Sequence, residues 1–296
     1  MIVLVTGANG QLGKSINHLV NQNKSDYHFI FTTRDQLDLT DFHNVRRFIE
    51  KNQFDVIINC AAFTSVDKSE LEKNQANMIN HLAVKNIAEI ASDNCIKLIH
   101  ISTDYVFDGL NLKPYNELDA TSPINVYGKT KVDGENAIMS SMTHNAVIIR
   151  TSWLYSEYGN NFVDSILTLA KKSKKLTVVS DQIGSPTYAY DLATSILKII
   201  ESNKFAQYTQ ISEILHFSNE GKCSWCDFAN EIVNISGLEC NIESIFSKDY
   251  PQTAKRPKYV LLDKSKIKDS FGLEIIYWKD SLNKCMKALS SSIYSN

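Results

Sequence analysis

The chain has 296 residues, which is enough for one large domain or for a core domain with a smaller lobe. Its 43% hydrophobic and 22% charged residues are ordinary for a globular protein. Its formal net charge of -2 creates no field that would attract nucleic acid or an anionic membrane surface, so any anionic ligand must be held by local donors. No apolar run reaches the roughly 18–20 residues that a membrane span needs, and the first residues do not resemble a signal peptide. We therefore expect a cytoplasmic protein that binds neither nucleic acid nor membranes.

Six cysteines are spread over the chain, and a chain of this size needs no disulfide framework. Cys223 and Cys226 form a CxxC pattern, which is a weak metal signal by itself because a structural zinc site needs four ligands. An apolar stretch with helical spacing follows this pattern. We interpret the two residues as half-buried thiols at the start of a helix, and we predict no metal site.

Predicted strands and helices alternate from the N-terminus to about residue 150. The strands are short continuous apolar runs, as in a parallel sheet that is buried on both faces, and they lie at residues 2–5, 29–31, 54–60, 97–102 and 146–150. The helices have apolar residues on one face and lie around residues 12–20, 45–49, 70–93 and 126–143. This alternation implies right-handed βαβ crossovers and therefore an α/β fold with a Rossmann-type, doubly wound parallel sheet.

The alternation becomes less regular after residue 152. We predict helices near 162–172 and 190–201, a turn at 184–186 and a return strand near 213–218. Residues 1–152 then form an NAD(P)-binding Rossmann domain, completed by the return strand. Residues 153–296 form mainly a smaller substrate-binding lobe, which is discontinuous and interleaved with the sheet domain.

Three glycines, Gly7, Gly10 and Gly13, lie between the first predicted strand and the first helix. Gly7 permits a tight turn, Gly10 lets the backbone approach a pyrophosphate, and Gly13 allows the helix to pack closely on the strand. The free N–H groups at the helix N-terminus suit phosphate oxygens. A glycine turn without a nucleotide is the alternative, but this position between strand and helix favours dinucleotide binding.

Arg34 follows the second predicted strand, where a Rossmann fold places the residue that contacts the ribose of the adenosine. An acidic residue here would bind the ribose 2′-hydroxyl, whereas an arginine suits a 2′-phosphate. We therefore predict NADPH as the cofactor, with NADH possible. The alternative is a solvated surface arginine.

Tyr127 and Lys131 are four residues apart on a predicted helix, so their side chains share one face. A nearby ammonium favours the phenolate, which would lower the pKa of Tyr127 and let it exchange a proton with a substrate oxygen. This spacing is common by chance, and an exposed helix with a solvated lysine is the alternative. Thr103 and Asp104, however, end the strand at 97–102, and the carboxyl ends of parallel strands are where ligands gather.

Together these residues resemble the extended short-chain dehydrogenases and, more narrowly, the dTDP-4-dehydrorhamnose reductase family. The resemblance is dense up to about residue 200 and thinner beyond it. Arg256-Pro257, followed by Leu262-Asp263, resembles the C-terminal motif of the family. The other matching segments are residues 6–13, 37–41, 59–64 with 66–67, 101–109, 127–131, 150–155, 159–162 and 181–187.

The resemblance implies reduction of the C4 keto group of a nucleotide-activated 6-deoxy-hexulose. The leading case is conversion of dTDP-4-dehydrorhamnose to dTDP-L-rhamnose for cell-surface polysaccharide synthesis. Tyr127 would protonate the C4 oxygen as hydride arrives, Lys131 would tune Tyr127 and bind the nicotinamide ribose, and Thr103 would orient the carbonyl. The implied cofactor-binding residues are Gly7, Gly10, Gln11, Leu12, Gly13, Arg34, Asp38, Leu39, Ala61, Ala62, Thr64 and Lys131. The implied substrate-binding residues are Thr103, Asp104, Trp153, Asn161 and Arg256, although Trp153 could instead be a core residue between the lobes.

Two segments depart from the family pattern. Lys258 follows Arg256-Pro257 where the family usually continues toward a small polar residue and an arginine, which leaves recognition of another sugar open. Some members form magnesium-bridged dimers through an acidic residue on the first helix, but Lys14 and Ser15 occupy that region here. We therefore predict no magnesium, and a homodimer stays possible.

Other functions on the same fold stay open. Sugar-nucleotide 4,6-dehydratases have an Asp-Glu pair after the strand-end threonine, whereas Tyr105 follows Asp104 here, which argues against dehydration. A sugar-nucleotide epimerase would retain its cofactor through turnover. The NADP-binding regulatory subunit of methionine adenosyltransferase resembles the same family and gives a non-catalytic alternative. The complete set of Thr103, Tyr127 and Lys131 favours a reductase.

Overall fold

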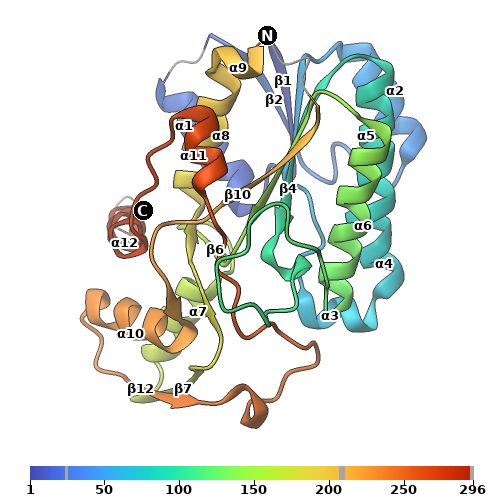
Figure 1. Ribbon diagram of the computed structural model, residues 1–296. Helices are drawn as coiled ribbons and strands as arrows, with labels where there is room; N and C mark the ends of the chain where they lie inside the picture. Colours follow the sequence, from blue (N-terminus) through green and yellow to red (C-terminus); the bar gives the residue numbers. More distant parts are fainter. Residues whose placement is uncertain (24–25, 207–210, 294–296) are drawn as a thin grey trace.

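A computed structural model describes residues 1–23, 26–206 and 211–293. Its centre is a parallel sheet with helices on both faces (Figure 1), and within the described residues this sheet has six strands in the order β10-β5-β4-β3-β1-β2. The predicted α/β fold class with a doubly wound parallel sheet is therefore confirmed. The strands are β1 (Ile2–Thr6), β2 (His28–Thr32), β3 (Val56–Asn59), β4 (Lys97–Thr103), β5 (Ala146–Thr151) and β10 (Glu213–Phe217).

The strand order reverses beside β1, which has β2 on one side and β3 on the other. Thr6 and Asn59, at the carboxyl ends of β1 and β3, are directly paired. A ligand-binding crevice forms at such a reversal, outside the carboxyl ends of the strands. The topology therefore fixes the edge of the sheet where a site is to be sought.

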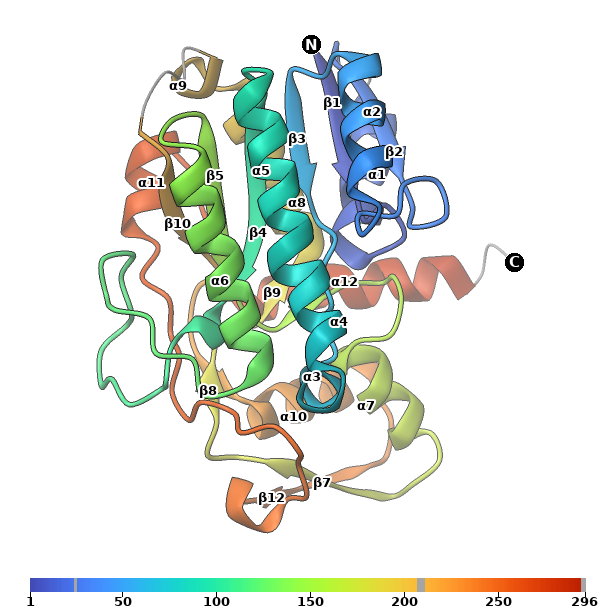
Figure 2. The same ribbon diagram turned by 90° about the vertical axis from the view of Figure 1, so that its right-hand side faces the viewer.

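Alternate residues of β1 supply the two hydrophobic cores. Val3 and Val5 pack with α1 (Gln11–Asn23), α8 (Ala189–Glu201) and α11 (Ser265–Phe271) on one face. Leu4 packs with α2 (Phe42–Asn52), α5 (Ala83–Asp93) and α6 (Val126–Ser141) on the other face. Figure 2 shows α5 and α6 running side by side along the second face. Successive side chains of a strand point to opposite faces, so a continuous apolar run serves both layers.

The predicted long helix at 70–93 is interrupted. It consists of α3 (Val66–Leu71), α4 (Lys73–Asn77), a π-helical turn (Met78–Leu82) and α5. Asn80 in the π-helical turn is fully buried, and its amide binds the backbone N–H and C=O of Phe63 at 2.8 and 3.1 Å and the hydroxyl of Thr130 at 3.2 Å. The helix is wound differently at the point where this buried polar side chain must satisfy the loop after β3.

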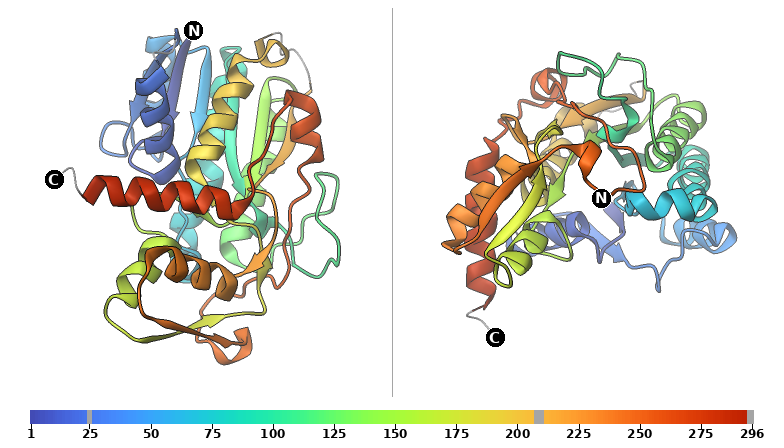
Figure 3. Two further views of the ribbon diagram at one scale, coloured as in Figure 1. Left: turned by 90° about the vertical axis from the view of Figure 1, so that its left-hand side faces the viewer. Right: turned by 90° about the horizontal axis from the view of Figure 1, so that it is seen from below.

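A smaller lobe lies below the carboxyl edge of the sheet in Figures 1 and 3. Its core includes Tyr155, Phe228 and Trp278, and α12 crosses between this lobe and the sheet layer (Figure 3, left). Cys223 and Cys226 are buried at the start of α10, more deeply than expected. Its main elements are α7 (Phe162–Ala170), the parallel pair β7 (Lys175–Val179) and β12 (Asn241–Ile245), α10 (Trp225–Ser236) and α12 (Trp278–Ile293).

The remaining elements are short. They are a 3-10 turn (Asp104–Val106), β6 (Leu154–Tyr155), β8 (Ile183–Gly184), β9 (Thr187–Tyr188), α9 (Asn203–Ala206), β11 (Cys223–Ser224) and a second 3-10 turn (Ser247–Asp249). The boundary drawn at residue 152 between the two lobes stays a prediction. Within the described ranges, no helix is both long and apolar enough to cross a membrane.

Candidate active site

Two adjoining cavities open at the carboxyl ends of β1 and β3. The first has a volume of about 540 Å³ and extends toward β4 and the smaller lobe, and the second has a volume of about 400 Å³ and extends toward the end of β2. Both are lined by Gly7, Asn9, Gly10, Cys60 and Ala62. Together they form one elongated crevice across the reversal in strand order.

The glycine loop forms the floor of this crevice. Gly7 has φ +70°, and a Cβ at this position would lie 2.8 Å from the backbone nitrogen of Ala61. A Cβ at Gly13 would lie 2.5 Å from the carbonyl oxygen of Gly7. At Gly10 only that carbonyl oxygen is within 4 Å, at 3.2 Å, so the backbone here is open to the crevice. This is the geometry that close approach of a pyrophosphate to a helix N-terminus requires.

Polar side chains line the rim of the second cavity. Arg34 Nε lies 3.7 Å from Asp38 Oδ2, and the two side chains are 68% and 42% exposed. Hydrogen bonds from the backbone and hydroxyl of Thr40 lower the pKa of Asp38, so its carboxylate is charged and fixed in the loop. Leu39 and Ala61 supply apolar walls. The cavity therefore presents apolar walls beside a largely exposed guanidinium that is paired with Asp38.

Thr103, Asp104, Tyr127 and Lys131 meet in the first cavity, and all four are buried. Thr103 ends β4, and its hydroxyl accepts a hydrogen bond from the backbone N–H of Tyr105, which turns the chain into a short 3-10 segment. Tyr127 and Lys131 come from α6, where they are one helical turn apart.

The start of α6 is fixed by a side-chain cap. Asn125 accepts a hydrogen bond from the backbone N–H of Gly128 at 2.7 Å, as a residue at the N-cap position does. The cap sets the helix so that Tyr127 lies in the first turn and Lys131 in the second. Tyr105 packs edge-to-face on Tyr127, with 5.6 Å between ring centroids and an interplanar angle of 72°.

Burial raises the pKa of Tyr127 to about 12, and a hydrogen bond with Thr103 opposes this only in part. The direction is opposite to the lowering that the sequence suggested. Lys131 Nζ donates to the carbonyl of Ile101 at 2.7 Å and lies 3.1 Å from His100 Nε2, while burial lowers its own pKa to about 8. Desolvation, which sequence spacing does not reveal, is the largest cause of the pKa shift in both groups, and Lys131 is not among the causes that act on Tyr127.

A buried polar chain runs behind Lys131. His100 Nδ1 lies 3.1 Å from Asn59 Nδ2, and the hydroxyl of Thr6 donates to Asn59 Oδ1 at 2.7 Å. Burial, and then the charge of Lys131, hold the pKa of His100 well below its ordinary value, so the imidazole is neutral. This series of polar contacts links β4, β3 and β1 behind Lys131. Polar residues within otherwise apolar strands are the sequence signal that could have identified it.

Asp104 is almost completely enclosed, and burial raises the pKa of its carboxyl group to about 7. Hydrogen bonds from the side chain of Thr103 and the backbone of Tyr105 oppose this rise. A carboxyl group that titrates near neutrality in a crevice is typical of a functional site. Its ionised form only accepts hydrogen bonds, whereas its protonated form can also donate one.

Trp153 lies at the boundary between the sheet layer and the smaller lobe. Its backbone has φ +46°, and its indole stacks on Trp225 with 3.6 Å between ring centroids and an interplanar angle of 12°. Trp153 also lines the first cavity, so the packing role and exposure to the site occur together. Asn161 lines the same cavity and caps α7 by accepting from the backbone N–H groups of Val163 and Asp164.

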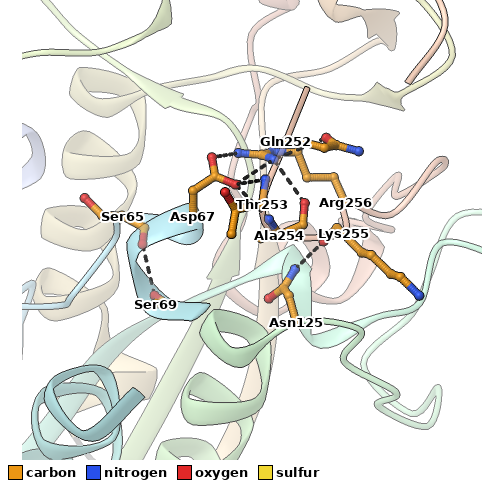
Figure 4. A network of polar contacts seen from close by, with 9 residues as sticks. All are labelled: Ser65, Asp67, Ser69, Asn125, Gln252, Thr253, Ala254, Lys255 and Arg256. Atoms are coloured by element: carbon orange, nitrogen blue, oxygen red, sulfur yellow. Dashed lines mark hydrogen bonds and ion pairs between the residues drawn. The ribbon is translucent and has the colours of Figure 1, made fainter. Parts of the chain in front are cut away.

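A third cavity, of about 330 Å³, lies in the smaller lobe on the other side of Trp225. Residues of α7 and β7 give it an apolar lining. Arg256 lines this cavity and not the first two, and its guanidinium forms an ion pair with Asp67 at 2.6 Å (Figure 4). The structure thus separates Arg256 from the other predicted site residues, all of which line the first or the second cavity.

Several residues of the crevice were given no binding role from the sequence, among them Asn9, Cys60 and Tyr105. Asn9 lies between the glycines of the loop, and Cys60 and Tyr105 follow β3 and Thr103. Burial raises the pKa of the Cys60 thiol to about 12, so this group is a neutral wall. Position next to a strand end would have pointed to all three.

Known proteins resemble this chain over almost its whole length. Residues 1–291 match the family described as RmlD substrate binding domain. The spore coat polysaccharide biosynthesis protein SpsK of Bacillus subtilis is 39% identical, with 98% of each chain covered. The dTDP-4-dehydrorhamnose reductase of Aggregatibacter actinomycetemcomitans is 40% identical, with 95% of this chain and 96% of that protein covered.

A solved structure extends the similarity to three dimensions. The dTDP-4-dehydrorhamnose reductase of Bacillus anthracis, crystallised in complex with NADP, has a TM-score of 0.90 and 35% identity, with 97% of this chain and 99% of that chain covered. The match therefore spans both the sheet layer and the smaller lobe. The chain belongs to the dTDP-4-dehydrorhamnose reductase family.

Proposed function

We propose that this protein reduces the C4 keto group of dTDP-4-dehydrorhamnose with NADPH and so forms dTDP-L-rhamnose for a cell-surface polysaccharide. The observation that carries the proposal is the burial of Thr103, Tyr127 and Lys131 in one cavity, directly beside an open glycine loop. The names of full-length relatives support the substrate, and the NADP complex of one of them supports the cofactor.

The crevice fits a dinucleotide. The backbone N–H groups near Gly10 would hold the pyrophosphate, the second cavity would receive the adenosine between Leu39 and Ala61, and Arg34 would pair with a 2′-phosphate. Lys131 would bind the nicotinamide ribose in the first cavity. When bound, NADPH supplies the hydride that is transferred to C4.

The polar cluster supplies the proton. Thr103 and Tyr127 donate hydrogen bonds to the carbonyl oxygen, and Tyr127 transfers its proton to that oxygen as negative charge develops on it. A phenol with a pKa of about 12 is fully protonated at neutral pH, which is the form that the reductive direction needs. The ammonium of Lys131 stabilises the phenolate that remains, and solvent then returns the proton.

The smaller lobe, together with Asp104 just after the end of β4, would hold the rest of the substrate. Asp104 binds a sugar hydroxyl, and Trp153 packs on an apolar face of the ring. The third cavity, with Phe162 and Trp225 in its wall, offers apolar space for the base, and Arg256 also lines it. We place the reaction in the cytoplasm and retain a homodimer as a prediction.

Purified protein, NADPH and enzymatically prepared dTDP-4-dehydro-6-deoxy-L-mannose test the proposal by absorbance at 340 nm. Stoichiometric oxidation that is lost in Tyr127→Phe, which keeps the ring and removes the hydroxyl, supports the reductase and its acid. NADPH binding without oxidation of NADPH or NADH would reject this substrate. Sugar interconversion without net consumption of cofactor would identify an epimerase instead, and binding without any turnover would lead to the regulatory-subunit alternative.

A further inference from the structure

Residues 252–256, which we call the strap, leave the smaller lobe after β12 and lie against the sheet layer beside the first cavity. Figure 4 shows Asp67, from the short helix α3, facing Arg256 of the strap, and Asn125 facing the backbone of Lys255. Val66, next to Asp67, lines the first cavity, whereas Gln252 and Arg256 line the third. The strap therefore lies between the place of the reacting sugar and the place of the nucleotide.

Asp67 is the centre of this contact. Its Oδ1 accepts from the backbone N–H groups of Thr253 and Ala254 at 3.1 and 2.8 Å and from Arg256 Nη1 at 3.3 Å. Its Oδ2 accepts from Arg256 Nη2 at 2.6 Å. The hydrogen bond with Arg256 is the main cause that lowers the pKa of this carboxyl group. One carboxylate thus binds three residues of the strap, and we call this set of contacts the clasp.

The guanidinium of Arg256 is held from several sides. Besides Asp67, Nη1 donates to Gln252 Oε1 and to the carbonyl of Ala254, each at 3.2 Å. A further hydrogen bond joins the guanidinium to the side chain of Tyr105. An arginine that binds this many protein acceptors fixes the shape of the strap, and its orientation depends on Asp67 in particular because that partner is charged and bidentate.

The strap also touches the catalytic helix. Asn125 donates to the carbonyl of Lys255 at 2.8 Å while its Oδ1 caps α6. Tyr105, the second contact of the strap, packs on the ring of Tyr127. The strap is therefore connected to Tyr127 through the cap on one side and through an aromatic contact on the other.

We propose that Asp67 is a positioning residue for the reaction, which through the clasp sets the wall of the third cavity and aligns the bound nucleotide-sugar with Tyr127. This inference rests on the proposed function for the identity of the substrate. Asp67 touches neither the reacting atoms nor the glycine loop, so its effect is on binding of the nucleotide-sugar and not on that of NADPH.

Asp67→Asn is the sharpest test, because the amide keeps the shape and one acceptor oxygen but loses the charge and turns a donor toward Arg256. We expect the KM for dTDP-4-dehydrorhamnose to rise about tenfold, the value of a hydrogen bond to a charged group, with kcat changed by less than about threefold. The Kd for NADPH stays as in the wild type. Asp93→Asn is the matched control, since it removes the exposed ion pair with Arg46 at 3.0 Å, between α2 and α5.

Hydrogen exchange gives a readout that does not need turnover. In Asp67→Asn the peptides that cover residues 250–257 and 125–131 exchange faster than in the wild type and in Asp93→Asn. If the wild type reduces no keto-sugar, the proposed function fails, and this exchange measurement still decides whether the clasp exists. Arg256→Gln added to Asp67→Asn raises KM by less than the product of the two single effects, because both changes break the ion pair between these residues.

Two results would overturn the inference. One is Asp67→Asn with wild-type KM and wild-type exchange in both peptides. The other is a parallel loss of kcat, of NADPH affinity and of thermal stability, which would make Asp67 a residue needed only for folding.

Discussion

The ion pair between Glu135 on α6 and Arg150 on β5 gives the strongest stability prediction, because both side chains are only 3% exposed and their closest atoms are 2.6 Å apart. Arg150 Nε also donates to both oxygens of Glu135, and the hydroxyl of Ser102 donates to Glu135 Oε1. The guanidinium lies over the ring of Phe107, 5.2 Å from its centroid. The pair fastens the catalytic helix to the centre of the sheet.

Glu135→Ala leaves the guanidinium of Arg150 buried without a counter-charge, which costs about 3–5 kcal/mol. With an unfolding entropy of about 2.1 cal/mol/K per residue over 296 residues, Tm should fall by about 5–8 °C. Replacing both residues by Met keeps the volume and removes both charges, so most of the loss should be recovered. Thermal unfolding followed by circular dichroism measures both variants.

A matched surface change separates burial from helix propensity. Glu89→Ala removes the exposed pair with Lys85 on α5, and we expect its Tm to stay within about 1 °C of the wild type, since exposed pairs contribute little. The reasoning is refuted if Glu135→Ala is no less stable than Glu89→Ala. It is also refuted if the double Met variant is as unstable as the single variant.

Three further predictions concern the site. Arg34→Ala should raise the KM for NADPH about tenfold and leave that for NADH unchanged, as steady-state kinetics with both cofactors would show; an equal effect on both would place Arg34 outside the 2′-phosphate contact. Catalysis needs the ammonium of Lys131, and burial lowers the pKa of this group to about 8, so kcat/KM should fall as pH rises through about 8. Glu135→Gln should shift this fall to lower pH, because Glu135 raises the pKa of Lys131. A pH profile of kcat/KM that is flat between pH 7 and about 9 would contradict the assignment. Trp225→Ala should raise the KM for the keto-sugar several-fold by removing the ring that stacks on Trp153, and Trp225→Phe should raise it less because an aromatic ring remains. Equal KM values of the two variants would count against a role of this stack.

The sequence predicts the core of the site because its signals are local. The glycine loop is recognisable from three residues within one turn between a strand and a helix. Tyr127 and Lys131 are one helical turn apart, and Thr103 ends a strand that is predicted from its mainly apolar residues 98–101. Each signal depends on neighbours in the chain, and parallel strands then bring their carboxyl ends to one edge without further information.

The smaller lobe lacks such signals. β7 is half exposed, and its partner β12 begins more than sixty residues later and also alternates between exposed and partly buried residues. A short pair of this kind has neither the continuous apolar run of a buried strand nor a turn that links its members. The break in the helix at 70–93 is similar, since it depends on where the buried amide of Asn80 finds its partners.

Electrostatic states are the part of the site that spacing reveals least. The distance between Tyr127 and Lys131 along the helix suggests a lowered phenol pKa, but the structure encloses both groups, and desolvation raises the one and lowers the other. Arg256 shows the same limit at longer range. Its motif suggests a substrate contact, which stays a prediction, and spacing gives no sign that its guanidinium binds Asp67, 189 positions earlier. The fold decides which partner a charged group meets, and that choice determines whether the group binds the substrate directly or shapes the wall that does.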